Sequence, residues 1–166
     1  LQELVAERGR LSEDEAVALA LDICEAASAI HALGVIHRDI TPKNVIVSGD
    51  GAHLIDFGIA RMYTEGASRD TTTLGTFGFA SPEQYGFEQT DARSDVYSIG
   101  RVLGYLLTGI MPNDEGYREA LADESVVSAR MRGVVDRACA MEPSARYQSA
   151  GDFAAALRGE KDAEAA

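Results

Sequence analysis

The sequence predicts a mainly α-helical chain with one small β-hairpin. Two long apolar segments, over 12–33 and 90–108, are each followed by a glycine, as is typical of helices. Two short apolar runs, 45–47 and 53–55, flank a polar turn at 48–51, which predicts a hairpin. The 166 residues are 46% hydrophobic, so we expect one domain with a sizeable core.

The net charge of the chain disfavours some classes of partner. Lys and Arg number 15 and Asp and Glu 27, a formal net charge of −12, and there is no basic stripe interleaved with aromatic residues. Binding to nucleic acid or to an anionic membrane surface is therefore disfavoured. No apolar run is long enough to span a bilayer, and the first residues lack the features of a signal peptide. We expect a cytoplasmic segment without nucleic-acid or membrane contacts.

The two cysteines carry little functional signal. Cys24 and Cys139 lie far apart and form no CxxC pair. We expect core thiols in a reducing compartment, and a transient redox role is the alternative.

The first third of the chain predicts two helices and a strand. Residues 1–10 form a short amphipathic pattern that ends at a glycine. Ser12, with Glu15 three residues later, is a capping box, so a second helix begins there. Its apolar residues continue to Leu33 and are spread around the helix, which indicates a well buried element. A short apolar strand over 35–36 follows.

A polar stretch over 37–44 precedes the hairpin and contains Asp39 and Asn44, and Asp56 follows the hairpin. The hairpin is expected to bring Asn44 and Asp56 together at its base. An amide and a carboxylate supply hard oxygen ligands for Mg²⁺, and a second carboxylate can orient a hydroxyl nucleophile. These residues therefore suit phosphoryl transfer, and an ordinary hairpin with polar turn residues is the alternative.

The middle of the chain predicts a long loop and a central helix. Residues 59–81 are polar and show little periodicity, as is typical of a functional or mobile loop. Thr90 or Asp91 can cap the next helix, which runs to about Thr108 with apolar residues around most of its circumference. Asp95 near its start is therefore predicted to be a buried charge that needs partners.

The last third predicts three further helices. They are expected to start at Asn113 or Asp114, to cover Val126 to Ala140, and to cover Ala150 to Leu157. The polar end is predicted to fray. The expected organisation is one domain over 1–158 and a tail over 159–166.

Two motifs in this chain resemble those of the eukaryotic-type protein kinases. His37, Arg38 and Asp39, with Asn44 and then Asp56, Phe57 and Gly58, resemble the catalytic and magnesium loops. Ser81, Pro82 and Glu83 resemble the end of the activation segment, with serine where the family usually has alanine. The resemblance covers about 1–157 and is to the C-terminal lobe of a bacterial eukaryotic-like Ser/Thr kinase, a truncated form of the α+β kinase fold.

The resemblance implies ATP and Mg²⁺ as cofactors and a protein substrate. Asp39 matches the general base that accepts the proton of the substrate hydroxyl. Asn44 and Asp56 match the Mg²⁺ ligands, and Ile46 matches the floor under the adenine. An alternative in the same chemistry is a small-molecule phosphotransferase, which the long loop and the pairing of Glu83 with Arg146 disfavour.

Further roles follow from the same resemblance. His37 and Phe57, next to Gly58, match the lower part of a stacked hydrophobic spine. The family usually has lysine where this chain has Thr41, so Lys43 is the candidate for the γ-phosphate, with a solvent-facing lysine as the alternative.

The resemblance also assigns residues outside the two loops. Thr71 or Thr72 is the expected phosphorylation site, whose phosphate pairs with Arg38, and Thr76 matches the family's substrate-facing threonine. Asp95 is expected to accept hydrogen bonds from the catalytic-loop backbone. Arg146 is expected to pair with Glu83 in a structural ion pair.

The family's ATP-grasping motifs do not occur before His37. There is no Gly-rich loop, no Val-Ala-Ile-Lys strand and no helix glutamate to pair with that lysine. We therefore expect a fragment with little or no kinase activity alone, an N-terminal lobe as partner, and an exposed apolar patch at Ile46, His37 and Phe57. The alternative is a pseudokinase-like binding module. Bacterial relatives often continue into a membrane span.

Overall fold

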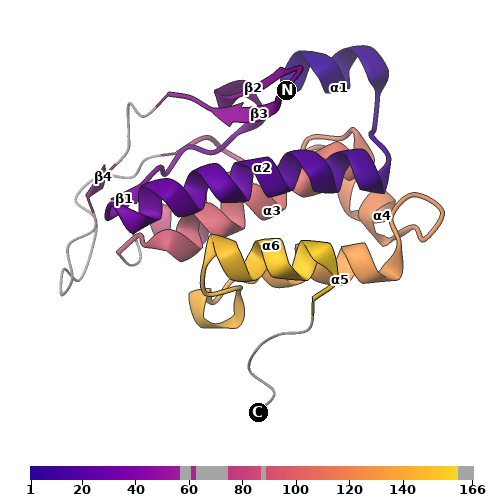
Figure 1. Ribbon diagram of the computed structural model, residues 1–166. Coiled ribbons are helices and arrows are strands. Elements are labelled where there is room, and N and C mark those ends of the chain that lie inside the picture. The colour runs from indigo at the N-terminus through magenta and orange to yellow at the C-terminus, as the bar shows by residue number, and fades with distance from the viewer. Residues whose placement is uncertain (57–60, 63–74, 87–88, 161–166) are drawn as a thin grey trace.

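The computed structural model of the protein describes residues 1–56, 61–62, 75–86 and 89–160 (Figure 1). The predicted site residues Phe57, Gly58, Thr71 and Thr72 lie outside this part, as do residues 161–166 of the predicted tail. The helices are α1 (Gln2–Arg8), α2 (Glu13–Ala32), α3 (Ala92–Thr108), α4 (Tyr117–Ala122), α5 (Ala129–Ala138) and α6 (Ala150–Arg158). The strands are β1 (Val35–Ile36), β2 (Val45–Ser48), β3 (Gly51–Leu54) and β4 (Arg61–Met62). Short 3₁₀ turns cover Pro42–Asn44, Pro82–Tyr85 and Pro143–Ala145.

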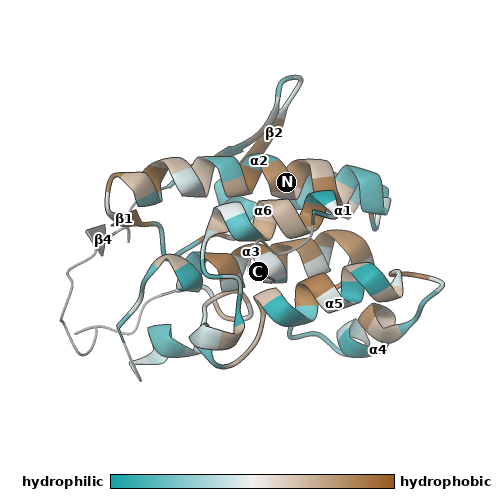
Figure 2. Cartoon of the chain, turned by 60° about the horizontal axis from the view of Figure 1, so that its bottom comes forward, coloured by the Kyte–Doolittle hydropathy of each residue, from teal (hydrophilic) through white to brown (hydrophobic). Residues whose placement is uncertain are grey.

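The helices form a layered body with the hairpin on one side. In Figure 1, α2 crosses the middle with α3 behind it, α5 and α6 lie below, and α1 and the β2–β3 hairpin lie above. Apolar and hydrophilic residues occupy different faces of several helices (Figure 2). The predicted class, mainly α with a small hairpin, is confirmed. No helix in the described ranges is both long and apolar enough to cross a membrane.

Helix α3 is the centre of the core, as its apolar residues predict. Most of its residues are buried, and it packs against α2, α4, α5 and α6. Asp91 caps its start by accepting the Arg93 N–H at 2.8 Å, and Gly109 ends it in a left-handed conformation with φ 72°. The absence of a side chain at Gly100 lets α5 approach closely, because a Cβ there would lie 2.7 Å from the Cβ of Ala138.

Residues at the helix ends also determine where the first two helices stop and start. Helix α1 ends at Gly9. At the start of α2, the Ser12 hydroxyl accepts the Glu15 N–H at 3.3 Å and the Glu15 carboxylate accepts the Ser12 N–H at 3.2 Å, which completes the predicted capping box. Cys24 is a buried core residue of α2, and burial raises the pKa of its thiol to about 12, so it stays protonated at neutral pH.

Two parts of the secondary-structure prediction were wrong. Strand β4 lies within the segment predicted to be a loop over 59–81, and it pairs antiparallel with β1, Val35 opposite Met62. The turn at Pro82–Tyr85 was also not predicted. A two-residue strand has no periodicity of its own, and here only its pairing with a distant strand defines it.

Helices α4 and α5 are shorter than predicted, whereas α6 (Ala150–Arg158) is found where the sequence predicts it. Helix α4 begins at Tyr117 rather than at Asn113 or Asp114, because Gly116 before it has φ 86° and the preceding residues form turns. Helix α5 begins after Ser128, whose hydroxyl accepts the Met131 N–H at 3.2 Å.

Candidate functional site

The polar stretch over 37–44 forms a loop between β1 and β2. Its backbone includes Arg38 with φ 71°, and Asp56 after β3 has φ 61°. They are the two residues other than glycine with positive φ in the described ranges. Such conformations are costly for residues with a side chain and are held only where the surroundings enforce them. Both lie in the two loops that the sequence motifs single out.

Asn44 holds the backbone and carboxylate of Asp39. Its side-chain Nδ2 donates to the Asp39 carbonyl at 2.9 Å and to Asp39 Oδ2 at 3.1 Å. The other oxygen of that carboxylate, Oδ1, accepts a hydrogen bond from the Thr76 hydroxyl at 2.6 Å. The Asp39 carboxylate therefore accepts the Asn44 amide on Oδ2 and the Thr76 hydroxyl on Oδ1.

Asn44 and Asp56 lie at the same end of the hairpin. Val45 pairs with Leu54 in the hairpin, and next to this pair the Ile55 N–H donates a hydrogen bond to the Asn44 carbonyl at 2.9 Å. Asp56 is exposed, and Asn44 is nearly buried. Because Asn44 uses its Nδ2 for Asp39, its Oδ1 remains an acceptor that a cation can use. A carboxylate and an amide oxygen at this end of the hairpin are suitable ligands for Mg²⁺.

Asp95 anchors the loop from below. This carboxylate is fully buried and accepts the His37 N–H on Oδ2 and the Arg38 N–H on Oδ1, both at 2.9 Å. His31 Nε2 lies 2.7 Å from the same Oδ2. Charge-assisted hydrogen bonds of this kind are the strong ones, and they fix the backbone where Arg38 has its unusual φ.

His31 was missed in the sequence, because a single histidine in the last turn of a helix carries no signal of a partner 64 positions away.

The His37 side chain joins the two loops. Its Nδ1 accepts the Asp39 N–H at 3.2 Å, and its Nε2 lies 3.0 Å from the Ile55 carbonyl. A neutral ring with its proton on Nε2 satisfies both contacts. His37 is fully buried by these internal contacts, so its inclusion in the predicted exposed patch is wrong, whereas Ile46 is exposed as predicted and Phe57 lies outside the described residues.

Gln84 connects the segment after Thr76 to the loop. Its Nε2 donates to the Arg38 carbonyl at 2.7 Å, and its Oε1 accepts the Ser81 N–H at 3.1 Å. Gln84 is fully buried. It was not predicted, although Ser81 with Gln84 three residues later has the spacing of a capping box; nothing local indicates the bond to Arg38.

Glu83 and Arg146 form a buried two-point ion pair. Arg146 Nη1 and Nη2 donate to the two carboxylate oxygens at 2.7 and 2.9 Å, and the Ser94 hydroxyl adds a third hydrogen bond to Glu83 at 2.7 Å. Arg146 also donates to the carbonyls of Ala140, Arg93 and Met141. Every donor of the guanidinium group is therefore directed at an oxygen inside the protein. The pair fastens the segment after Thr76 to the C-terminal third of the chain.

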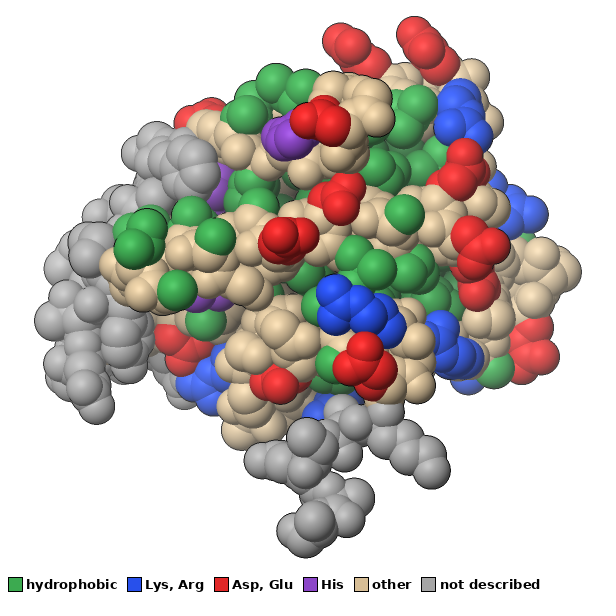
Figure 3. Space-filling model, in the orientation of Figure 1, with side chains coloured by type: hydrophobic (Ala, Val, Ile, Leu, Met, Phe, Trp, Pro, Cys, Tyr) green, Lys and Arg blue, Asp and Glu red, His purple; other side chains and the backbone are tan. Residues whose placement is uncertain are grey.

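Two cavities flank the loop. One of about 720 Å³ lies between α1 and residues 42–47, with the side chains of Lys43 and Ile46 on its wall. Lys43 is exposed, and Ile46 is 51% exposed. Hydrophobic side chains are visible at the surface in this upper part of the molecule (Figure 3). The second cavity, of about 260 Å³, is lined by parts of 41–43, 76–79 and 111–114.

The sequence matches a known domain family and known proteins. The family described as protein kinase domain matches residues 1–155. The chain is 36% identical to serine/threonine-protein kinase PknB of Mycobacterium tuberculosis, over 95% of this chain and 28% of that protein. It is 34% identical to PknD of the same species, over 94% of this chain and 26% of PknD.

A probable serine/threonine-protein kinase PknB of Corynebacterium glutamicum is 37% identical, over 95% of this chain and 28% of that protein. The chain thus spans about a quarter of the length of the curated relatives it matches.

Proposed function

Since this chain belongs to the protein kinase domain family, we propose that it is the catalytic lobe of a protein serine/threonine kinase. The proposed reaction transfers the γ-phosphoryl group of ATP to a serine or threonine hydroxyl of a protein. The observation that carries the proposal is the carboxylate of Asp39, which Asn44 orients and which accepts a hydroxyl hydrogen bond at 2.6 Å.

In the proposed mechanism, Asp39 is the base. The substrate hydroxyl takes the position next to Oδ1 that the Thr76 hydroxyl occupies, and it donates its proton to that oxygen as its own oxygen attacks the γ-phosphorus of ATP. The bond from this phosphorus to the bridging oxygen breaks, and ADP leaves. Thr76 then lines the entry of the substrate. Positioning of this kind supplies much of the catalysis in phosphoryl transfer, because the protein makes no covalent bond to the phosphoryl group.

We assign the cofactor contacts to residues around the hairpin. Asn44 Oδ1 and Asp56 would hold Mg²⁺, which neutralises charge on the β- and γ-phosphates when it is bound. Ile46, half exposed beside the 720 Å³ cavity, is suited to lie under the adenine. Lys43, exposed beside the same cavity, is suited to the γ-phosphate.

The proposed phosphorylation site and the proposed partners include residues that the structure does not describe. A phosphate on Thr71 or Thr72 would pair with Arg38, whose backbone Asp95 and Gln84 already hold. The proposed partners are a protein substrate and an N-terminal lobe with the Gly-rich loop and the strand lysine that hold ATP in this family.

Substitution of Asp39 by asparagine tests this proposal. The chain is joined at Leu1 to the ATP-binding lobe of the related PknB, and phosphate transfer from Mg·ATP to a protein rich in serine and threonine is measured. Asp39→Asn is expected to lower the rate at least about 100-fold, since a positioned base contributes 10²–10⁴-fold.

The matched control is Asp123→Asn, which changes an exposed carboxylate far from the loop and is expected to leave the rate unchanged. Unchanged transfer by a folded Asp39→Asn protein would remove the base from the mechanism and contradict the proposal.

A further inference from the structure

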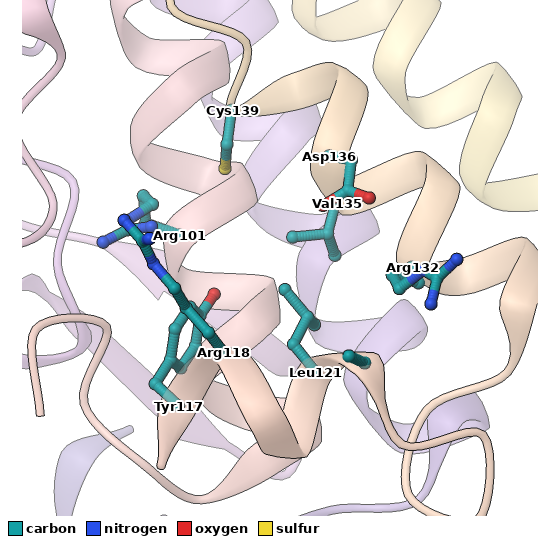
Figure 4. Close-up of a pocket in the computed structure, with 9 residues that line it drawn as sticks. Arg101, Tyr117, Arg118, Leu121, Arg132, Val135, Asp136 and Cys139 are labelled. Atoms are coloured by element: carbon teal, nitrogen blue, oxygen red, sulfur yellow. The ribbon is translucent and has the colours of Figure 1, made fainter. Parts of the chain in front are cut away.

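A separate cavity of about 430 Å³ lies between α3, α4 and α5 (Figure 4). It shares no lining residue with the loop over 37–44 or with the two cavities beside that loop. Its volume is in the range of small-molecule sites. The charged residues on its wall are Arg101 of α3, Arg118 of α4, and Arg132 and Asp136 of α5.

The wall of this cavity is positively charged although the chain as a whole carries −12. Three guanidinium groups and one carboxylate give a local formal charge of +2. The side chains of Arg118 and Arg132 make no hydrogen bond or ion pair with any residue that the structure describes. Like charges brought together without a counter-ion repel each other, so the arrangement favours an anion carrying two charges.

Arg101 is held in place beside this cavity. Its Nε donates to the Gly78 carbonyl at 2.8 Å and its Nη2 to the Pro112 carbonyl at 3.2 Å. Its guanidinium also lies over the ring of Tyr117, 5.3 Å from the centroid. These contacts fix the group and leave Nη1 as a donor, so Arg101 is a preorganised part of the wall.

Tyr117 is a buried part of the cavity wall beside Arg101. The residue is 3% exposed, and its hydroxyl lies against Gly104 of α3, where a Cβ would collide with it. Its ring rises from α4 toward α3 between Arg101 and Leu121 (Figure 4). Burial raises the pKa of this hydroxyl, so it stays uncharged and adds no negative charge to this side of the cavity.

From these observations we infer that the cavity binds a phosphate monoester. The dianionic head group lies at Arg101 and Arg118, whose side chains are on the same side of the cavity in Figure 4, and its carbon body contacts Leu121 and Val135. A phosphate monoester carries about −1.5 to −2 at neutral pH, which matches the local charge. Planar guanidinium groups bind phosphate oxygens through paired N–H donors. A free organic phosphate and a phosphorylated protein side chain share this chemistry.

The test is a titration of the 166-residue chain with phenyl phosphate, in which binding is measured by changes in amide chemical shifts and by calorimetry. Shifts are expected in α4 and α5, and phenol, which lacks the phosphate, is expected to cause none. Arg118→Ala is expected to weaken binding about tenfold, the effect of one hydrogen bond to a charged group. Arg132→Ala, on the other side of the cavity in Figure 4, is expected to leave binding unchanged. Neither substitution removes a contact within the described protein, so both variants are expected to fold.

The matched control is Arg158→Ala, which removes an exposed arginine at the end of α6. No saturable binding by the wild-type chain, or equal weakening by Arg158→Ala, would overturn the inference. A phosphothreonine peptide that binds more tightly than phenyl phosphate identifies a protein ligand, and the reverse identifies a free metabolite. The readout is binding without phosphate transfer, so this result and that of the Asp39→Asn assay are independent.

Discussion

Replacement of Glu83 by glutamine is expected to lower the free energy of unfolding by about 3–5 kcal/mol, the usual cost of breaking a buried ion pair. The change keeps the shape of the side chain but leaves the guanidinium of Arg146, which is 1% exposed, without its counter-charge. It also weakens the acceptor for the Ser94 hydroxyl. Urea unfolding followed by circular dichroism measures the change.

Glu124→Gln is the matched control, because Glu124 is exposed and the same atoms change. Its unfolding midpoint is expected to stay where it is. A similar midpoint for Glu83→Gln would show that Arg146 finds other compensation, and the ion pair would then not be what fastens the segment after Thr76.

The same variant carries a pH signature. Burial alone raises the pKa of Glu83, but the hydrogen bonds from Arg146 and Ser94 outweigh it and hold the pKa below its usual value of 4.5. The carboxylate therefore stabilises the fold fully above pH 4.5 and loses this contribution as the pH falls through the lowered pKa of the folded state. The difference in unfolding free energy between wild type and Glu83→Gln is expected to shrink below pH 4.5.

Replacement of Asp95 by asparagine is expected to cost about 3 kcal/mol, since two charge-assisted hydrogen bonds of 1.5–3 kcal/mol each are weakened or lost. The amide can accept one of the two backbone N–H groups, but its NH₂ would face the other. The backbone of Arg38, with φ 71°, then lacks an anchor. Urea unfolding gives the cost, and amide hydrogen exchange at His37 and Arg38 locates it.

Asp14→Asn is the control for Asp95→Asn, because Asp14 is an exposed aspartate near the start of α2. It is expected to change neither the stability nor the exchange in the loop. Unchanged protection of His37 and Arg38 in Asp95→Asn would mean that Gln84, which bonds the Arg38 carbonyl, holds the loop without the carboxylate.

Elements with local signals were predictable from the sequence. The capping box at Ser12, the cap at Asp91 and the hairpin around 48–51 depend on residues within a few positions of each other, and all three are present. Strand β4 and the start of α4 were not predictable, because pairing with β1 and a left-handed Gly116 set them. Neither leaves a periodic pattern in the sequence.

The candidate site follows the same division. The motif residues could be named from their resemblance to the protein kinases, which also implied the contact of Asp95 with the loop backbone and that of Glu83 with Arg146. His31 and Gln84 could not, because each meets its partner only after folding, across 64 and 46 positions. The burial of His37 was also missed, since its two ring contacts depend on the turn of the loop.

The most direct test of the proposed centre is Mn²⁺ binding, measured by electron paramagnetic resonance as a substitute for Mg²⁺. The protein is the chain joined to the PknB ATP-binding lobe, with a non-hydrolysable ATP analogue. We expect Asn44→Ala and Asp56→Asn each to weaken binding at least about tenfold, because the first removes the amide oxygen ligand and the second removes the negative charge of the carboxylate. Asp50→Asn, at the opposite end of the same hairpin, is expected to bind as wild type does. Equal Mn²⁺ binding by all four proteins would contradict the proposed centre.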